Sequence, residues 1–207
     1  MQGKLIYIEG GEATGKSTQC GRLAEIFTRE GHKVHRAHEP GGGLGKLVRD
    51  LLFLPELEQL PKKRRRLVEY HLFLADRAAH AAKLEERISE GCIILSDRGR
   101  WGTVVYQGYA QGMDINKIMQ ANEEAMEGVT EDLVIVLDGD PEELNKRLIT
   151  RGETNRFDDK PLDFHRSVRR GFTILARKHN WPVIDAVGSE EEITAKLRAV
   201  IRDRLGI

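Results

Sequence analysis

The residues best suited to chemistry stand close to the N-terminus, in the run Gly10-Gly-Glu-Ala-Thr-Gly15-Lys16-Ser17-Thr18. The spacing Gly10-x-x-x-x-Gly15-Lys16-Ser17 fits the phosphate-binding loop pattern. Glycines let the backbone curl so that several N–H groups point into one anion-sized hollow, and a helix starting near Lys16 adds its positive end. Lys16 can reach the terminal phosphates of a nucleotide, and the Ser17 hydroxyl can join the coordination sphere of Mg²⁺.

This pattern also occurs by chance, as a glycine-rich turn that caps a helix and binds nothing. Its position between an apolar strand-like run and a helical pattern favours the binding interpretation. The stretch therefore predicts a nucleoside triphosphate site. Its candidate ligands are Gly10, Gly11, Glu12, Ala13, Thr14, Gly15, Lys16, Ser17 and Thr18.

Two further groups of polar and aromatic residues could complete a site. Asp97 and Arg98 end an apolar run, where an acid can hold Mg²⁺ or its water shell. Tyr70, Phe73 and Arg77 are spaced i, i+3, i+7 and share a helix face, which suits a nucleobase that stacks on a ring and bonds a guanidinium. A strand-end ion pair and ordinary core packing are the commoner explanations of such residues taken alone.

Arginines also gather around a polar, glycine-containing segment at residues 151–160, which lies between two helical patterns. Arg147, Arg151 and Arg156 surround it. A mobile flap carrying arginines could close on phosphates and neutralise the charge that develops during transfer. A solvated loop is the alternative.

The elements that must position these residues alternate between strand and helix. Short apolar runs separated by helical patterns indicate a parallel sheet covered on both faces, in an α/β fold. We expect strands at 4–9, 33–38, 92–96, 133–137 and 182–184. We expect helices from 16 to about 30, at 44–53, at 62–90 with a break near 67, and at 103–112, 114–128, 140–151, 164–178 and 190–205, with a loop between Pro55 and Pro61.

Composition limits the possible functions. With 207 residues, one domain is expected. The 33 basic and 33 acidic residues balance, so the sequence suggests neither a nucleic-acid polymer nor a membrane surface as a partner. Cys20 and Cys92 form no visible metal or disulfide pattern and look like buried apolar residues, which suits the cytoplasm. No signal peptide is expected. The basic run at 62–66 is interpreted as a solvated helix start, with a local acidic partner left open.

Several motifs in this order resemble the thymidylate kinases, within the nucleoside monophosphate kinases, over nearly the whole chain. After the phosphate loop come Glu39-Pro-Gly-Gly42 with Leu47-Val-Arg-Asp-Leu-Leu52, and then Leu72-Phe-Leu-Ala-Asp-Arg77. Asp97-Arg98, Tyr106-Gln-Gly108, Val136-Leu-Asp138 with Asp140-Pro-Glu-Glu143, and Arg151-Gly-Glu-x-x-Arg156 follow. No single motif except the phosphate loop is specific by itself.

The resemblance implies phosphate transfer from MgATP to a deoxynucleoside monophosphate, foremost dTMP. It also implies a three-layer P-loop kinase fold, with one domain over residues 1–207, a five-stranded parallel sheet, a small lid at about 151–160, and a homodimer. Lys16, Arg98, Arg151 and Arg156 are the implied catalytic residues, because the phosphate loop carries Glu12-Ala13 and no arginine. Ser17 and Asp97 are the implied metal ligands. The implied acceptor residues are Glu39, Arg49, Phe73, Arg77, Arg98, Gly102, Thr103, Tyr106 and Gln107.

The sequence departs from the family pattern on the acceptor side. His38 stands where the family commonly has arginine, and Gly43 where it has threonine. The run Gly99-Arg100-Trp101-Gly102-Thr103 lacks the usual aromatic at 99 and a hydroxyl at 102, and gains an indole at 101. Drift within an ordinary thymidylate kinase explains these changes. A pocket reshaped for a modified deoxypyrimidine or another deoxynucleotide is the alternative, as are a nucleotide-dependent switch and a non-catalytic homologue.

Overall fold

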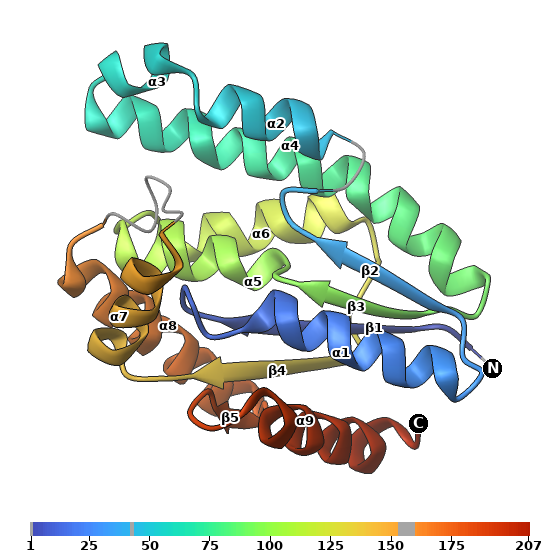
Figure 1. The fold of residues 1–207 in the computed structure, drawn as a ribbon. Helices are drawn as coiled ribbons and strands as arrows, with labels where there is room; N and C mark the ends of the chain where they lie inside the picture. Colours follow the sequence, from blue (N-terminus) through green and yellow to red (C-terminus); the bar gives the residue numbers. More distant parts are fainter. Residues whose placement is uncertain (1, 42–43, 153–159) are drawn as a thin grey trace.

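Five strands form one parallel sheet in the order β2-β3-β1-β4-β5, as Figure 1 shows. They are β1 (Lys4–Gly10), β2 (Val34–His38), β3 (Ile93–Asp97), β4 (Leu133–Asp138) and β5 (Val183–Asp185). The structure is a computed structural model and describes residues 2–41, 44–152 and 160–207. The predicted α/β fold with a five-stranded parallel sheet is confirmed, and no strand bound differs from the prediction by more than one residue.

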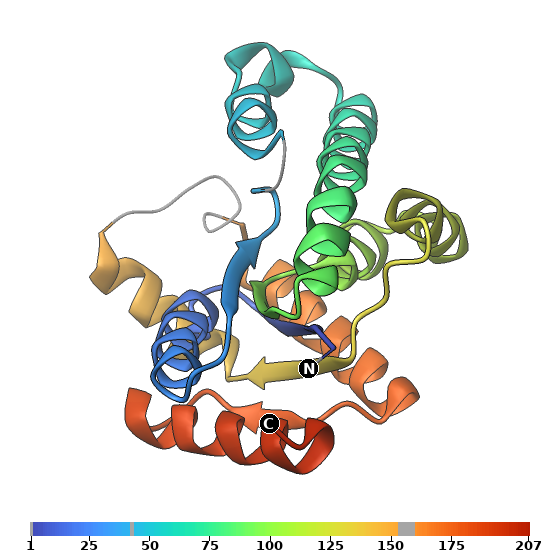
Figure 2. The ribbon, with the colours of Figure 1, turned by 90° about the vertical axis from the view of Figure 1, so that its right-hand side faces the viewer.

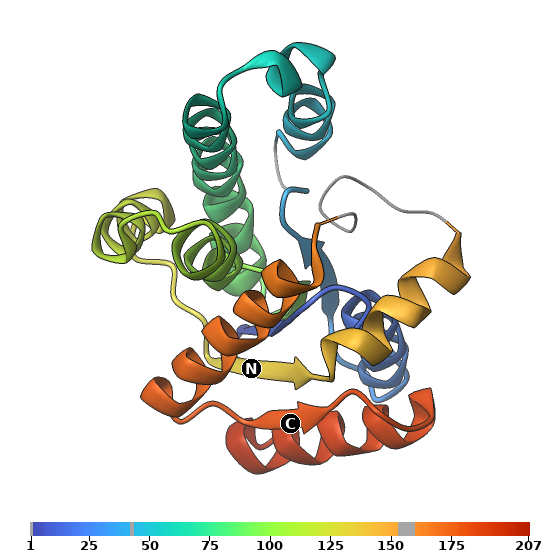
Figure 3. The same cartoon turned by 90° about the vertical axis from the view of Figure 1, so that its left-hand side faces the viewer.

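Alternate residues of the central strand β1 pack in two separate hydrophobic cores, because successive side chains of a strand point to opposite faces of the sheet. Ile6 and Ile8 pack with residues of α1 (Lys16–Arg29) and α9 (Glu190–Leu205). Leu5 and Tyr7 pack with residues of α4 (Lys62–Ser89), α6 (Ile115–Met126) and α8 (Leu162–His179). Figures 2 and 3 show these helices on the two sides of the sheet. The resulting three layers fix the carboxyl ends of the strands at one edge.

Several helices differ from the sequence-based expectations. The long helix α4 runs unbroken, so the predicted break near Leu67 is wrong. A short helix, α3 (Pro55–Gln59), follows α2 (Gly45–Leu52) where a loop was expected. The single helix predicted at 103–112 is instead α5 (Arg100–Thr103) continued by the π-helix η1 (Val104–Ala110). The remaining helix in the described part is α7 (Pro141–Arg151), whose predicted start is confirmed by the Asp140 carboxylate accepting from Glu142 and Glu143 N–H.

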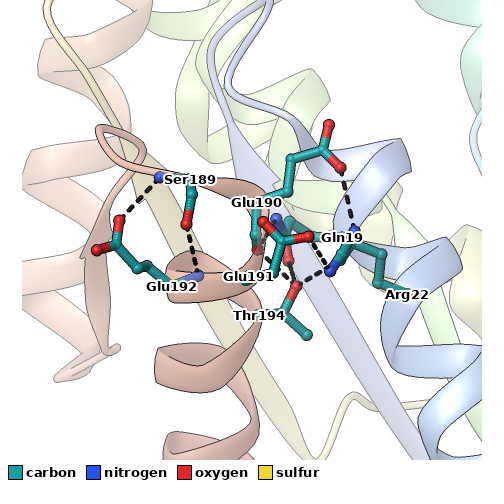
Figure 4. Close-up of polar contacts among 7 residues, drawn as sticks. All are labelled: Gln19, Arg22, Ser189, Glu190, Glu191, Glu192 and Thr194. Carbon is teal, nitrogen blue, oxygen red and sulfur yellow. Dashed lines mark hydrogen bonds and ion pairs between the residues drawn. The ribbon is translucent and has the colours of Figure 1, made fainter.

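The helix that follows the phosphate loop is fastened to the last helix of the chain (Figure 4). The amide of Gln19 on α1 accepts from the Thr194 hydroxyl at 2.7 Å and donates to the Glu190 carbonyl at 3.1 Å. The guanidinium of Arg22 donates to the Glu191 carboxylate at 2.6 Å. Ser189 and Glu192 form a reciprocal capping box that starts α9 at this junction. Gln19 and Thr194 are buried, so the junction fixes α1 against α9.

The two cysteines are free and buried, as predicted. Among the described residues, no helix combines the length and the apolar composition that crossing a bilayer requires.

Candidate active site

The phosphate loop joins β1 to α1 with unusual backbone geometry at both ends. Gly10 has a φ of 146°, and a Cβ atom there would lie 2.3 Å from the Leu137 carbonyl oxygen on β4, so only glycine fits. Gly15 caps α1 in the left-handed region. The ammonium of Lys16 donates to the Gly11 carbonyl at 2.6 Å, and the Thr14 hydroxyl donates to the same oxygen at 3.0 Å. A buried positive charge therefore lies inside the loop, at the positive end of α1.

A cavity of about 380 Å³ opens beside this loop. The strand register brings β2 and β3 to the same edge, since His38 pairs with Asp97. The cavity is lined by most of the predicted triphosphate ligands and by charged residues of three other segments: Glu12, Ala13, Gly15, Lys16, Ser17, Thr18, His38, Glu39, Asp97, Arg98 and Arg147. We refer to this cavity as the donor cavity.

Ser17 and Asp97, the two predicted metal ligands, are in direct contact in the donor cavity. The Ser17 hydroxyl donates a short hydrogen bond to the Asp97 carboxylate. Both groups offer oxygen atoms, which suit Mg²⁺. In the described part of the chain, no cluster of three or more histidine, cysteine, aspartate or glutamate side chains could hold a metal by itself. This donor set fits a magnesium ion that is completed by nucleotide phosphates and water.

A second cavity, of about 210 Å³, lies between α2, α4 and the start of η1. We refer to it as the acceptor cavity. All nine residues predicted for the acceptor side line it, namely Glu39, Arg49, Phe73, Arg77, Arg98, Gly102, Thr103, Tyr106 and Gln107. It is also lined by Glu12, Pro40, Leu52, Phe53 and Gly99. Phe53, a second aromatic residue of this lining, was not predicted from the sequence, although it stands one turn after Arg49 on the same helix pattern.

Arg77 is held more tightly than a base-reading residue needs to be. Its Nε donates to Glu39 at 2.9 Å, its Nη1 to Asn122 at 2.6 Å, and its Nη2 to both Glu39 and Thr103. These four hydrogen bonds leave one guanidinium N–H for a ligand. Tyr70, which the sequence places on the same face, packs in the core and does not line the cavity.

Glu12, Arg98 and Tyr106 form a connected polar group where the two cavities meet. The Glu12 carboxylate accepts from Arg98 Nη2 at 3.0 Å and from the Tyr106 hydroxyl at 2.8 Å, and Arg98 lies over the Tyr106 ring. Burial disfavours the charged form of Glu12. Arg98, Lys16 and the Tyr106 hydroxyl outweigh this and lower the pKa of Glu12 to about 2. Glu12 is therefore an anion that holds two acceptor-side groups in place.

His38 accepts a hydrogen bond from Arg49 rather than adding positive charge. The Arg49 Nη1 lies 2.9 Å from the His38 Nε2. Because a guanidinium only donates, this ring nitrogen must be unprotonated. Burial and the neighbouring Arg49 charge lower the pKa of His38, which agrees with a neutral ring. Where the family commonly has an arginine at position 38, this chain has a neutral histidine that holds Arg49 by a hydrogen bond.

Only part of the unusual run at 99–103 faces the acceptor cavity. The Trp101 indole donates to Glu131 at 2.7 Å and packs on Trp181, with ring centroids 4.8 Å apart, outside the cavity lining. At Gly99, a Cβ atom would lie 2.6 Å from the ring of Tyr7. The ring of Tyr7 on β1 therefore occupies the space that a side chain at 99 would need. The indole gained at 101 is thus internal packing, whereas the losses at 99 and 102 lie on the wall of the acceptor cavity.

Glu9 is a buried carboxyl group next to this site. Its Oε1 accepts from the Gly99 N–H at 2.9 Å, and its Oε2 is buried without a hydrogen-bond partner. Burial raises the pKa of Glu9 to about 8, against the opposing effects of Arg98 and the Gly99 N–H.

This raised pKa predicts a pH-dependent stability difference for Glu9→Gln. In the unfolded chain Glu9 ionises near pH 4.5, and in the folded protein near pH 8. Between these values the unfolded state holds fewer protons, so the folded state loses stability as the pH rises. A neutral glutamine avoids this loss. The variant should therefore gain stability over the parent from pH 5 to pH 8, as measured by urea unfolding. A gain that stays constant with pH, or one also seen for the exposed control Glu85→Gln, would contradict this assignment.

The predicted lid is only partly described. Arg147 on α7 lines the donor cavity and donates to the Ala186 carbonyl at 3.0 Å. Arg151 is the last residue of α7. Arg156 and most of the predicted lid lie outside the described residues.

Comparisons with known proteins agree with one another. A sequence model of a family described as thymidylate kinase matches residues 8–197. The thymidylate kinase of Carboxydothermus hydrogenoformans is 36% identical over 203 residues, covering 97% of this chain and 98% of the relative. That of Synechococcus sp. is 37% identical over 210 residues, covering 97% of this chain and 95% of the relative. A crystal structure of thymidylate kinase from Ehrlichia chaffeensis superposes with a TM-score of 0.77 at 27% identity, covering 97% of this chain and all of the other.

Proposed function

The chain belongs to the thymidylate kinase family of ATP-dependent nucleoside monophosphate kinases, and we propose that its two cavities transfer the terminal phosphoryl group of ATP to dTMP. The observation that carries this proposal is the junction of the cavities. Glu12, Glu39 and Arg98 line both. Phosphoryl transfer between two nucleotides needs the donor and acceptor phosphates at one point, where positioning and charge stabilisation supply most of the rate.

On the donor side, the loop N–H groups and the N-terminus of α1 bind the phosphates of ATP. The Lys16 ammonium already lies in the loop and neutralises charge on the group being transferred. Ser17 and Asp97 hold Mg²⁺ together with nucleotide oxygens and water. When bound, the metal supplies charge neutralisation of the phosphates.

On the acceptor side, two aromatic rings and two arginines fit a nucleoside monophosphate. Phe73 stacks on the base, with Phe53 as a second apolar wall, and the free N–H of Arg77 reaches the base edge. Arg49 and Arg98 bind the acceptor phosphate. Tyr106, fixed by Glu12, lies against the deoxyribose. The acceptor phosphate is itself the nucleophile, so no strong general base is required.

Arg98 stands at the junction and contacts the phosphates of both nucleotides. Arg151 and Arg156 are proposed to add charge from the lid at about 151–160 when it closes, because the phosphate loop has no arginine. We propose that the whole chain forms one kinase domain. We also propose that it acts in the cytoplasm, because its two cysteines are free and buried, as is usual in a reducing compartment.

Product analysis tests the proposal. The parent protein, incubated with MgATP and a panel of nucleoside monophosphates, should form dTDP from dTMP at least as fast as it forms any other diphosphate. The position of Trp101 outside the acceptor cavity supports dTMP over a modified deoxypyrimidine, because the added indole takes no space from the base. Faster turnover of another monophosphate would favour the reshaped-pocket alternative. Release of free phosphate without diphosphate formation would favour a nucleotide switch, and no turnover at all a non-catalytic homologue.

We also propose that two copies of the chain associate through α2, α3 and the start of α4. Exposed apolar side chains occur on these helices and on the residues that flank them: Leu44, Leu47, Leu54, Leu60, Leu67 and Val68. A surface of this kind on helices that form one end of the molecule in Figure 1 suits a second copy with the same surface.

Leu47→Glu should convert the protein from dimer to monomer in light scattering, because Leu47 is 57% exposed and a buried unpaired carboxylate opposes association. Val187→Glu is the matched control. Val187 is also an exposed apolar residue, but it lies after β5, at the other end of the sheet from α2. A parent that is monomeric, or two variants that dissociate equally, would reject this interface.

A further inference from the structure

Arg98 has a backbone conformation that arginine rarely adopts. Its φ is 80°, in the left-handed region, where a side chain with a Cβ atom costs about 1 kcal/mol relative to glycine. Such strain persists only where surrounding contacts enforce it. Arg98 also lines both cavities, so the enforcing contacts determine where its guanidinium points relative to them.

Two buried side chains hold the peptide unit that follows Arg98. The Ser96 hydroxyl on β3 donates to the Arg98 carbonyl oxygen at 2.8 Å. The Glu9 carboxyl on β1 accepts from the N–H of Gly99 at 2.9 Å. Both ends of one peptide unit are therefore bonded by fully buried groups from two neighbouring strands. The Arg98 N–H is bonded as well, to the Ile8 carbonyl at 3.2 Å.

Side-chain packing also restricts rotation of the Arg98–Gly99 peptide. Gly99 is buried, and the ring of Tyr7 lies directly against its Cα. Rotation of the peptide would break two buried hydrogen bonds at once. It would remove the hydrogen bond to Glu9 Oε1, and Glu9 Oε2 already has no partner among the described residues.

We propose that Ser96 and Glu9 are positioning residues that hold the Arg98–Gly99 peptide in the orientation that directs the Arg98 guanidinium to the junction of the donor and acceptor cavities. This rests on the proposed function of Arg98 in binding the phosphates. Neither Ser96 nor Glu9 lines either cavity, so their effect on the reaction passes through Arg98.

Steady-state kinetics of Ser96→Ala tests this role. Loss of one buried hydrogen bond to the peptide should raise KM for dTMP and lower kcat, each by up to about tenfold, with KM for ATP changed less than twofold. Glu9→Leu should behave in the same way, and Glu9→Gln should recover most of the loss, because its amide oxygen still accepts from Gly99. Ser89→Ala is the matched control, since it removes a surface hydroxyl that also bonds a backbone carbonyl. Parent-like kinetics for Ser96→Ala would overturn the proposal.

A double-mutant cycle separates positioning from a general structural effect. In an Arg98→Ala background there is no guanidinium to direct, so Ser96→Ala should cause less than a twofold further loss of kcat/KM. An equal loss in both backgrounds would overturn the proposal.

Stability gives a readout that does not depend on the reaction. Arg98→Gly should melt about 2–4 °C above Arg98→Ala, because glycine accepts the left-handed backbone. This difference should shrink when Ser96→Ala is added, because the peptide is then freer to relax. Equal melting temperatures for the two Arg98 variants would show that the conformation is not enforced, and would overturn the proposal. A parent that forms no dTDP would reject the proposed function and leave this comparison valid.

Discussion

Replacement of Lys16 by alanine is expected to lower the rate of dTDP formation by about a thousandfold while the protein stays folded. Among the described residues that line the donor cavity, Lys16 is the only lysine, and the Gly11 carbonyl holds its ammonium inside the phosphate loop. Removing one preorganised charge or donor from a site of charge transfer commonly costs two to three orders of magnitude in turnover. The loss should appear in kcat, because the charge on the transferred group grows toward the transition state.

The measurement is kcat for dTDP formation at saturating ATP and dTMP, together with the melting temperature. Lys196→Ala is the matched control, since Lys196 is exposed on α9 away from both cavities. A Lys16→Ala protein that keeps more than a tenth of parental turnover would refute the role of Lys16. A variant that has lost its thermal transition would call for Lys16→Met, which keeps the apolar part of the side chain.

The second large effect is expected from Arg77→Ala, which should destabilise the protein by about 3–5 kcal/mol and abolish dTMP binding. Arg77 is 2% exposed and is the main hydrogen-bond partner of the buried Glu39. Burial raises the pKa of Glu39, but Arg77 and His80 lower it by more, so Glu39 stays charged in the parent. Without the guanidinium, the buried Glu39 carboxylate keeps, within the described part of the chain, only His80 as an ion-pair partner, at 3.6 Å.

The pH dependence of this loss has a defined sign. In the parent, the depressed pKa of Glu39 contributes stability above its unfolded pKa, which is lost only as the pH falls through the lower folded value. In Arg77→Ala the uncompensated carboxyl takes up a proton when folded, so the destabilisation should be larger at pH 7 than at pH 4.5. Urea unfolding at the two pH values measures this.

A paired substitution distinguishes charge from packing. Arg77→Met with Glu39→Gln removes both charges and should recover at least half of the lost stability without restoring activity. Arg166→Ala, which breaks exposed ion pairs on α8, should leave stability almost unchanged. If the double variant is no more stable than Arg77→Ala, the loss comes from packing rather than from the unpaired carboxylate.

The parts of this site that could be predicted are those set by local sequence. The phosphate loop is a continuous motif, and its strand–loop–helix context was readable from hydrophobic periodicity. The resemblance then supplied acceptor residues from five separate segments, and the structure brings all of them to one cavity. Their individual roles, and those of Arg151 and Arg156, stay predictions.

What could not be predicted depends on contacts between distant segments. The direction of Trp101 is set by Glu131 and Trp181, and the need for glycine at 99 is set by Tyr7 on another strand. Tyr106 lies on a π-helix, which differs from an α-helix in its backbone hydrogen bonds. The sequence showed no residue pattern that distinguishes the two. From its sequence position, Phe53 is the last apolar residue of an amphipathic helix. It lines the acceptor cavity because the fold brings Phe73 and Arg77 of α4 to the same cavity.

The fastening of α1 to α9 has a consequence for how this protein becomes competent during synthesis. The hydrogen bond between Gln19 and Thr194 spans 175 positions, so the helix behind the phosphate loop gains this partner only after Thr194 has left the ribosome. The central strand β1 must likewise wait for β3 and β4. Chains interrupted before residue 190 therefore carry the entire nucleotide-binding motif and still lack the support that shapes it. Translation of the phosphate-loop segment therefore precedes, by more than 175 residues, translation of the residue that fixes the helix behind it.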